Sequence, residues 1–220
     1  MNRVADVSQA LPARKRRLAF EYHASEQASI NHIRSKGAEY AESALRVRRD
    51  LSQEISAPPA LPSMAMRHTK MDDRIEQQSY IDVYNEAMVS GRSQIIVPAA
   101  MTLSDWRNFL RRVILPRGTV ILACQDRQII GSVSCFWDEE ENQRMGRRVG
   151  TVDNVFVREG WRRRGIAGRM MCAGFDYFKA KGLEFARLNV NSDNEGALKL
   201  YESLGFVTVH SLQMFVLDLA

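Results

Sequence analysis

Apolar and polar positions divide the chain near residue 60. From Ile30 to Leu51, apolar or small residues recur at steps of three and four, a heptad spacing that predicts an amphipathic helix. We expect this helix to lie on the main domain or, as the alternative, to join two copies of the chain in a homodimer. Residues 1–25 show no period and are expected to be loose, and the three prolines between Ser56 and Ser63 favour an extended linker.

Downstream of the linker, short β-rich runs alternate with helical periods. The pattern predicts helices at 72–89, 102–113, 165–181 and 194–204, the last two ending at Gly182 and Gly205. Residues 138–148 are expected to form a polar loop, and Asp126-Arg127 a hairpin turn. Sheets with interspersed helices indicate an α+β domain with a mixed sheet at 63–220, preceded by a basic, helical extension at 1–62. The predicted strands are 64–68, 119–125, 128–137, 149–157, 185–191 and 206–219.

Composition is that of a globular protein, with 45% apolar and 26% charged residues. The net charge of +5 favours anionic partners without naming one, and the Arg14–Arg17 run is expected to be solvated, so nucleic acid is not an expected partner. The three cysteines form no Cys-x-x-Cys pair and the four histidines are scattered, so no metal is expected. Without a long apolar run or a signal segment, we expect a cytoplasmic protein with no membrane partner.

The strongest chemical signal follows the predicted strand at 149–157. After a five-residue turn comes Arg162-Arg163-Arg164-Gly165-Ile166-Ala167-Gly168, which opens a helix. Free N–H groups and the dipole at a helix start bind anions, small residues admit a diphosphate to the backbone, and guanidinium groups suit phosphate oxygens. The loop lacks the Lys-Ser/Thr pair of a Walker loop and the spacing of a dinucleotide fold. The alternative is a basic surface turn.

A second motif changes the balance between these alternatives. The predicted strand at 185–191 is followed by Asn194, Ala197, Tyr201, Gly205 and Phe206 in the order Asn-x-x-Ala-x-x-x-Tyr-x-x-x-Gly-Phe. Together with the earlier Arg-x-x-Gly-x-Ala loop, the chain closely resembles the GNAT superfamily of N-acetyltransferases over residues 64–220. The resemblance implies a GNAT-like fold, acetyl-coenzyme A as acyl donor and a primary amine as acceptor.

The resemblance also implies roles for individual positions. Val155 and Val157 match the strand whose backbone pairs with the pantetheine arm, and Asn194 matches a coenzyme-contacting asparagine. Arg163 stands where glycine is common in the family. The arginine and glycine positions of residues 162–168 match the loop that binds the coenzyme diphosphate in the family. The expected coenzyme-binding residues are therefore Val155, Val157, Arg162, Arg163, Arg164, Gly165, Ala167, Gly168 and Asn194.

Acyl transfer to an amine needs a base, an oxyanion site and an acid for the departing thiolate. Tyr201 matches the family tyrosine that often acts as general acid, and half-buried packing is its alternative role. Relatives often carry a glutamate where this chain has Thr151, so Asp153, two residues on, is the expected base acting through water. A solvated carboxylate is the alternative for Asp153, and the acidic run 138–141 is a further candidate region.

Two functions from different classes follow. The first is an enzyme that acetylates a small-molecule or protein amine, with acceptor choice around Tyr80, Tyr84, Trp106 and residues 138–148. The second is a module that binds acyl-coenzyme A without turnover while its N-terminal extension binds a partner. Tyr201 favours the enzyme, and the missing glutamate at Thr151 keeps the second function open.

Overall fold

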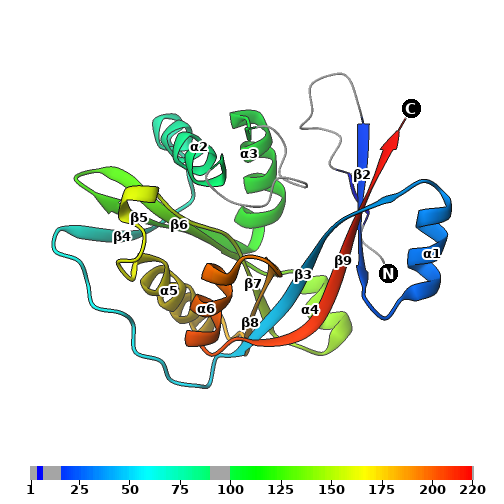
Figure 1. Cartoon of the computed structure of the whole chain (residues 1–220). Helices are drawn as coiled ribbons and strands as arrows, with labels where there is room; N and C mark the ends of the chain where they lie inside the picture. The colour runs from blue at the N-terminus through cyan, green and yellow to red at the C-terminus, as the bar shows by residue number, and fades with distance from the viewer. Residues whose placement is uncertain (1–3, 7–15, 90–99, 220) are drawn as a thin grey trace.

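The computed structural model describes residues 4–6, 16–89 and 100–219 (Figure 1). These residues form one nine-stranded sheet with the order β1-β2-β9-β3-β8-β7-β6-β5-β4. Neighbouring strands are antiparallel except β7 and β8, which are parallel, so the predicted mixed sheet is confirmed. The strands are β1 Val4–Asp6, β2 Arg16–His23, β3 Glu39–Asp50, β4 Met64–Thr69, β5 Gly118–Gln125, β6 Gln128–Phe136, β7 Val149–Val157, β8 Phe185–Asn191 and β9 Val207–Leu219.

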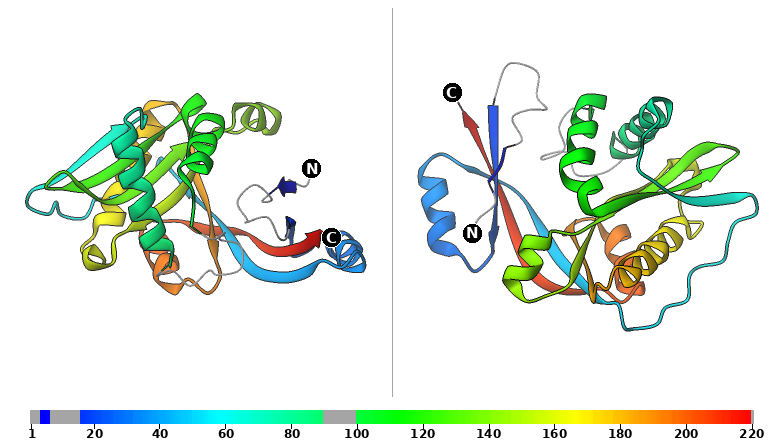
Figure 2. Two further views of the ribbon diagram at one scale, coloured as in Figure 1. Left: turned by 90° about the horizontal axis from the view of Figure 1, so that it is seen from above. Right: turned by 180° about the vertical axis from the view of Figure 1, so that it is seen from behind.

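Helices cover both faces of the sheet around β5 to β8. In Figure 1, α2 and α3 lie on one face and α5 and α6 on the other, while α1 lies beside the arm formed by β2 and β9. Figure 2 shows β3 and β9 curving together away from the helical layers toward α1. The helices are α1 Gln27–Ser35, α2 Arg74–Val89, α3 Leu103–Phe109, α4 Glu139–Met145, α5 Ile166–Ala180 and α6 Glu195–Ser203. A π-helical turn at Leu110–Ile114 and 3-10 turns at Leu115–Arg117 and Glu159–Trp161 complete the described elements.

Strand alternation separates two apolar cores. In β5, Ile121 and Ala123 face the core that α5 and α6 complete, whereas Val120 and Leu122 face the core of α2 and α3. The first core holds most of the buried face of α5, including Phe175. Because β5 to β7 are packed on both faces, their backbones hold the residues at their ends in fixed positions.

Most predicted elements downstream of residue 63 are confirmed. Thr102 caps α3 in a capping box with Asp105, and Gly182 and Gly205 take the left-handed conformation after α5 and α6. The hairpin turn at 126–127 is also confirmed, since β5 and β6 pair on either side of it. The predicted polar loop at 138–148 is wrong in part, because Asp138 caps a short helix there, α4.

The predicted helix at 30–51 is wrong beyond its first turns. Helix α1 ends at Ser35, and residues 39–50 form the long strand β3 instead. The expected looseness of residues 1–25 is wrong for 4–6 and 16–23, which form β1 and β2 of the sheet, while 1–3 and 7–15 lie outside the described residues. Of the basic run, Arg16 and Arg17 begin β2, while residues 14 and 15 lie outside the described part of the chain.

Strand β3 pairs with β8 on one side and with β9 on the other. The extension therefore supplies a central strand of the sheet, which argues against cutting the chain between residues 62 and 63. The proposed division into 1–62 and 63–220 stays a prediction about independent folding. Among the described residues, no helix has the length and apolar character needed to span a membrane.

Candidate active site

The candidate site begins where β7 and β8 part. Their parallel pairing runs only from Val149 and Phe185 to Thr151 and Arg187, although both strands continue further. Beyond Thr151, β7 pairs with β6 alone among the described strands. Its other edge therefore turns backbone N–H and C=O groups toward an opening in the sheet, where an extended ligand can add as a strand.

A β-bulge marks this opening. Asn154 and Val155 together lie opposite the single residue Val133 of β6, and Asn154 has a positive φ of 48°. The extra residue resets the alternation of β7. As a result, Val155 and Val157 contact the core of α5 and α6, while Phe156 belongs to the core of α2 and α3. Both predicted pantetheine-contacting valines thus face the α5/α6 side.

Asp153, the expected base, precedes the bulge and lies opposite Ser134. Its side chain reaches solvent, yet protein surrounds it on its other sides, and this burial raises the pKa of the carboxyl. The N–H of Asn154 donates a 2.7 Å hydrogen bond to Asp153 Oδ1 and opposes that increase. Burial, then the charge of Asp153, raises the pKa of Tyr84 to about 12. Because Val152 belongs to the α5/α6 core, strand alternation puts the neighbouring Asp153 on the α2 side of β7.

Tyr201, the expected acid, belongs to the core on the other face of the sheet. It lies on α6, is 8% exposed, and its ring meets Phe206 edge-on with centroids 5.7 Å apart. Burial raises the pKa of its phenol well above the usual range, and the charge of Asp153 adds to the increase. The phenol is therefore protonated at neutral pH, as a proton donor must be.

One carboxylate of the acidic run near α4, that of Glu141, is paired with an arginine. Arg187 of β8 donates hydrogen bonds of 2.9 and 2.5 Å to the two carboxylate oxygens of Glu141, and one of 3.2 Å to Thr151 Oγ1. Thr151, where relatives often carry glutamate, thus holds an arginine that neutralises Glu141. Because Glu141 is paired, Asp153 is the better placed of the two carboxylates to accept a proton.

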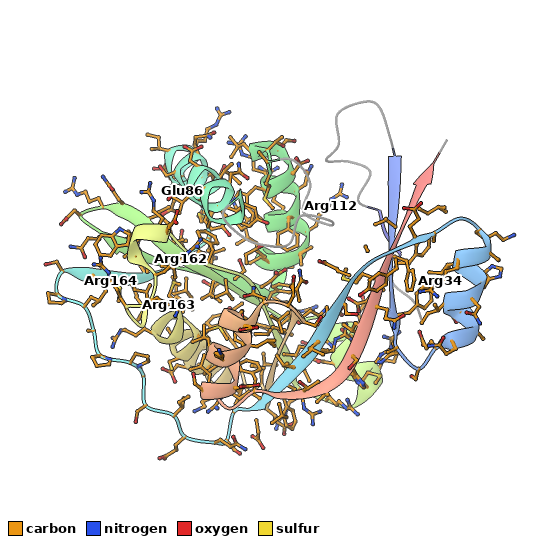
Figure 3. The ribbon with its side chains drawn as sticks, in the orientation of Figure 1. Arg34, Glu86, Arg112, Arg162, Arg163 and Arg164 are labelled. Atoms are coloured by element: carbon orange, nitrogen blue, oxygen red, sulfur yellow. The ribbon has the colours of Figure 1, made fainter. Side chains whose placement is uncertain are left out.

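The predicted diphosphate-binding segment, residues 162–168, is called the phosphate loop below. It connects β7 to α5 after a 3-10 turn (Figure 3). Gly165, with φ of 74°, directly precedes α5 and offers no side-chain cap, so the first N–H groups of the helix lack an intrahelical acceptor. Arg163 is exposed and also has a positive φ, 61°. Ala167 and Gly168 belong to the first turn of α5, so the loop has the backbone expected of an anion site.

Two of the three loop arginines hold the loop itself. Arg162 Nε donates to the carbonyl of Val157 at 3.0 Å, and its Nη2 to that of Ala87 on α2 at 3.4 Å. Arg164 donates to the carbonyl of Gly160 at 3.1 Å and lies over the ring of Trp161. Figure 3 shows all three arginines on the loop, with Glu86 of α2 nearby. Arg162 and Arg164 therefore shape the loop, and Arg163 is the freer side chain toward a phosphate.

Sequence reasoning missed two features of this loop. Arg158 forms a two-pronged ion pair with Glu86, with hydrogen bonds of 2.8 to 3.2 Å that tie the loop to α2. Pro58 of the linker packs on the start of α5, and Arg169 donates a hydrogen bond to its carbonyl. The first pairing carries no signal in the spacing of residues. The second has one, because Ile55, Pro58 and Leu61 recur every third residue.

Asn194 lies at the start of α6, where its Oδ1 accepts a 3.2 Å hydrogen bond from the Ala197 N–H. This cap fixes the turn between β8 and α6, and its contact with the coenzyme stays a prediction. All three cysteines are free and buried, as expected. Within the described ranges, no three histidine, cysteine or acidic side chains gather as a metal site.

Comparison with solved structures defines the class of fold. A GCN5-related N-acetyltransferase from Sphaerobacter thermophilus matches with a TM-score of 0.68 and 18% identity, over 94% of this chain and 61% of that one. A tandem GNAT protein from the clavulanic acid biosynthesis pathway matches with a TM-score of 0.67 and 12% identity, over 99% of this chain and 62% of that one. The fold is thus that of the GNAT acyltransferases, as expected.

Sequence comparison gives the family. The profile of the acetyltransferase (GNAT) family matches residues 80–206, more than half of the chain, and the chain belongs to that family. A mycothiol acetyltransferase of Brachybacterium faecium is 23% identical over 84% of this chain and 54% of its own length. The N-alpha-acetyltransferase 30 of Schizosaccharomyces pombe is 28% identical over 44% of this chain and 63% of its own length. The chain spans less than two thirds of these relatives.

Proposed function

We propose that this chain is an N-acetyltransferase that moves an acetyl group from acetyl-coenzyme A to a primary amine. The observation that carries the proposal is the early end of the pairing between β7 and β8, which leaves an open edge of β7 with the two candidate groups on opposite faces of the sheet. Tyr201 comes from the α6 side and Asp153 from the α2 side. Family membership supports the same donor.

The acyl donor and the amine are expected to bind on opposite faces of the sheet. Val155 and Val157 face the α5/α6 side, where the uncapped start of α5 can take the diphosphate, so the donor fits that side. Asp153 lies beside Tyr84 on the α2 side, so the amine fits there. Bound in this way, acetyl-coenzyme A supplies the activated acyl group, and the opening in the sheet lets the amine reach it.

The residues of the chain then handle the protons and charge. An alkyl ammonium has a pKa of about 10.4, so it must lose a proton before attack, and Asp153 accepts that proton through water. Free N–H groups on the edge of β7 stabilise the oxyanion that forms as the amine nitrogen bonds to the acyl carbon. As the carbon–sulfur bond breaks, Tyr201 donates its proton to the thiolate. The nitrogen, now bonded to the acyl carbon, releases its second proton to water, and Tyr201 regains a proton from solvent. The products are an amide and free coenzyme A.

The acceptor is a small-molecule or protein amine. Both kinds are represented by name among the relatives, as mycothiol acetyltransferase and N-alpha-acetyltransferase. An assay of coenzyme A release, with pooled amino sugars, amino acids and peptides with free N-termini as acceptors, tests the proposal. Release above the rate without acceptor is expected. Tight acetyl-coenzyme A binding without release would instead favour the alternative, a module that binds acyl-coenzyme A without turnover.

A further inference from the structure

The linker between β3 and β4 lies against the helices instead of hanging free. Residues 54–62, here called the proline strap, form neither helix nor strand and pass along the α5/α6 side of the sheet (Figures 1 and 2). Within it, Ile55, Pro58 and Leu61 are partly buried and every residue between them is exposed. This period of three is that of a polyproline II helix with one face on the domain.

The outer contacts of the strap are apolar. Ile55 and Leu61 both pack against the α5/α6 core. Between them, the Arg169 side chain of α5 donates a hydrogen bond to the carbonyl of Pro58. Few backbone hydrogen bonds hold the strap, of which one joins the Met64 N–H to the Leu61 carbonyl at 3.2 Å. Such a segment can lift locally at small cost while the sheet stays intact.

The ring of Pro58 lies on the first turn of the helix that begins at the phosphate loop. A Cβ placed on Gly165 would lie 3.0 Å from Pro58 Cβ, and one on Gly168 would lie 2.9 Å from Pro58 Cγ. The same point on Gly168 lies 3.8 Å from Leu200 Cδ1 of α6. Pro58 therefore occupies the junction of α5 and α6, against the glycines that leave room for a diphosphate.

We propose that the proline strap is an autoinhibitory element, in which Pro58 competes with the diphosphate of acyl-coenzyme A for the start of α5. The inference rests on the proposed coenzyme site. Two groups cannot share the surface of Gly165 and Gly168, so the coenzyme binds only when the strap lifts. Its apparent affinity is lowered by the fraction of molecules whose strap is seated.

Two strap variants separate the contact from the stiffness of the linker. Pro58→Gly removes the ring that lies on α5, whereas Pro59→Gly loosens the same backbone at an exposed neighbour. We expect Pro58→Gly to lower the calorimetric Kd for coenzyme A by roughly three- to ten-fold. The Pro59→Gly control should match the unmodified chain. Equal affinity in all three proteins, or weaker binding by Pro58→Gly, would overturn the proposal.

A direct measurement of seating completes the test. In the full chain without coenzyme, a nuclear Overhauser contact is expected between the Pro58 ring and the Gly168 α-protons, and saturation with coenzyme A should abolish it. Persistence of that contact in the complex shows that strap and coenzyme coexist and refutes the competition. Failure of both the unmodified chain and Pro58→Gly to bind coenzyme A would overturn the proposed function, and the strap proposal with it.

Discussion

Asp153 and Tyr201 differ in what their surroundings do to their charge. Burial raises the pKa of both groups. For the carboxyl, the shift moves its pKa from an ordinary value near 3.8 toward the pH at which a base must work. For the phenol, it keeps the proton in place across neutral pH. One physical cause thus suits the first group to accept a proton and the second to donate one.

The raised pKa of Asp153 predicts a cost in stability. The folded state holds the proton of Asp153 more tightly than the unfolded state, so no penalty exists below the unfolded pKa, and stability is lost as the pH rises through the folded pKa. Asp153→Asn should therefore raise the melting temperature at pH 7 and leave it unchanged near pH 3. Thermal unfolding followed by circular dichroism across this pH range measures the difference.

The same variant should lose acetyl transfer, because an amide cannot accept the proton of the amine. Asp72→Asn, at an exposed position before α2, is the matched control and should change neither property. Full activity in Asp153→Asn would leave that carboxylate without a role in proton transfer. A melting temperature at pH 7 equal to that of the unmodified chain would show that its charge is well solvated.

Tyr201 separates chemistry from binding. Tyr201→Phe keeps the ring against Phe206 and removes only the hydroxyl. We expect kcat and kcat/KM to fall together by about 10²- to 10⁴-fold, with the Kd for acetyl-coenzyme A nearly unchanged. Tyr177→Phe, at a half-buried position near the C-terminal end of α5, is the control and should keep full activity. If the pre-steady-state rate of acetyl transfer is unchanged in Tyr201→Phe, Tyr201 is a packing residue.

Among the elements, α5 begins without a side-chain cap, and the strand before it leaves its partner strand after Thr151. The glycine that precedes it supplies a left-handed turn and no cap, so the helix depends on another group for its first N–H donors. The bulge in β7 turns Val155 and Val157 toward the same side. The bulge and the helix start therefore both lie on the side of the sheet where the coenzyme is predicted to bind.

Gly165→Asp tests this predicted coenzyme site. Aspartate at this position would be strained at φ of 74° and its Cβ would lie 3.0 Å from Pro58 Cβ, while its carboxylate would repel a diphosphate at the start of the helix. The Kd for acetyl-coenzyme A should rise about 100-fold or more, since several charge-assisted hydrogen bonds are lost. Gly182→Asp is the control, because Gly182 has the same φ of 74° in open space after α5. Unchanged affinity in Gly165→Asp, measured by calorimetry, would remove the loop from the coenzyme site.

The burial pattern of β3 explains why the predicted helix at 30–51 is wrong over residues 39–50. Its buried residues Ala41, Ala44 and Val47 recur every third residue, as on a helix. Regular pairing with β8 puts Ala44 and Val47 on opposite faces, and a register shift toward β9 falls at Ala41. Both faces of β3 carry buried and half-buried residues, so its pattern lacks the alternation of a strand with one buried and one exposed face. Periodicity alone cannot separate these cases.

At the scale of the molecule, the segment before the linker completes the sheet. Strand β3 joins β8 to β9, so a chain beginning at Ser63 would leave both without their shared partner. We expect this truncated chain to be unfolded or aggregated, as judged by circular dichroism and gel filtration. A chain beginning at Arg16 loses the edge strand β1 and should stay folded. A folded, coenzyme-binding protein from Ser63 onward would contradict this expectation and support the division at residues 62 and 63.

The sequence by itself determined most of the local elements after residue 63, α4 excepted, the glycine that ends α5, and the two motifs that assign the family. These depend on neighbours within a few positions, where propensity and turn chemistry act directly. Only the tertiary structure decided that β3 enters the sheet, that Glu141 is paired, that Asp153 faces α2 while Tyr201 faces α5, and that Pro58 rests on the phosphate loop. Each of these pairs residues far apart in sequence, and such contacts are fixed by the packing of the whole chain, which no local spacing encodes.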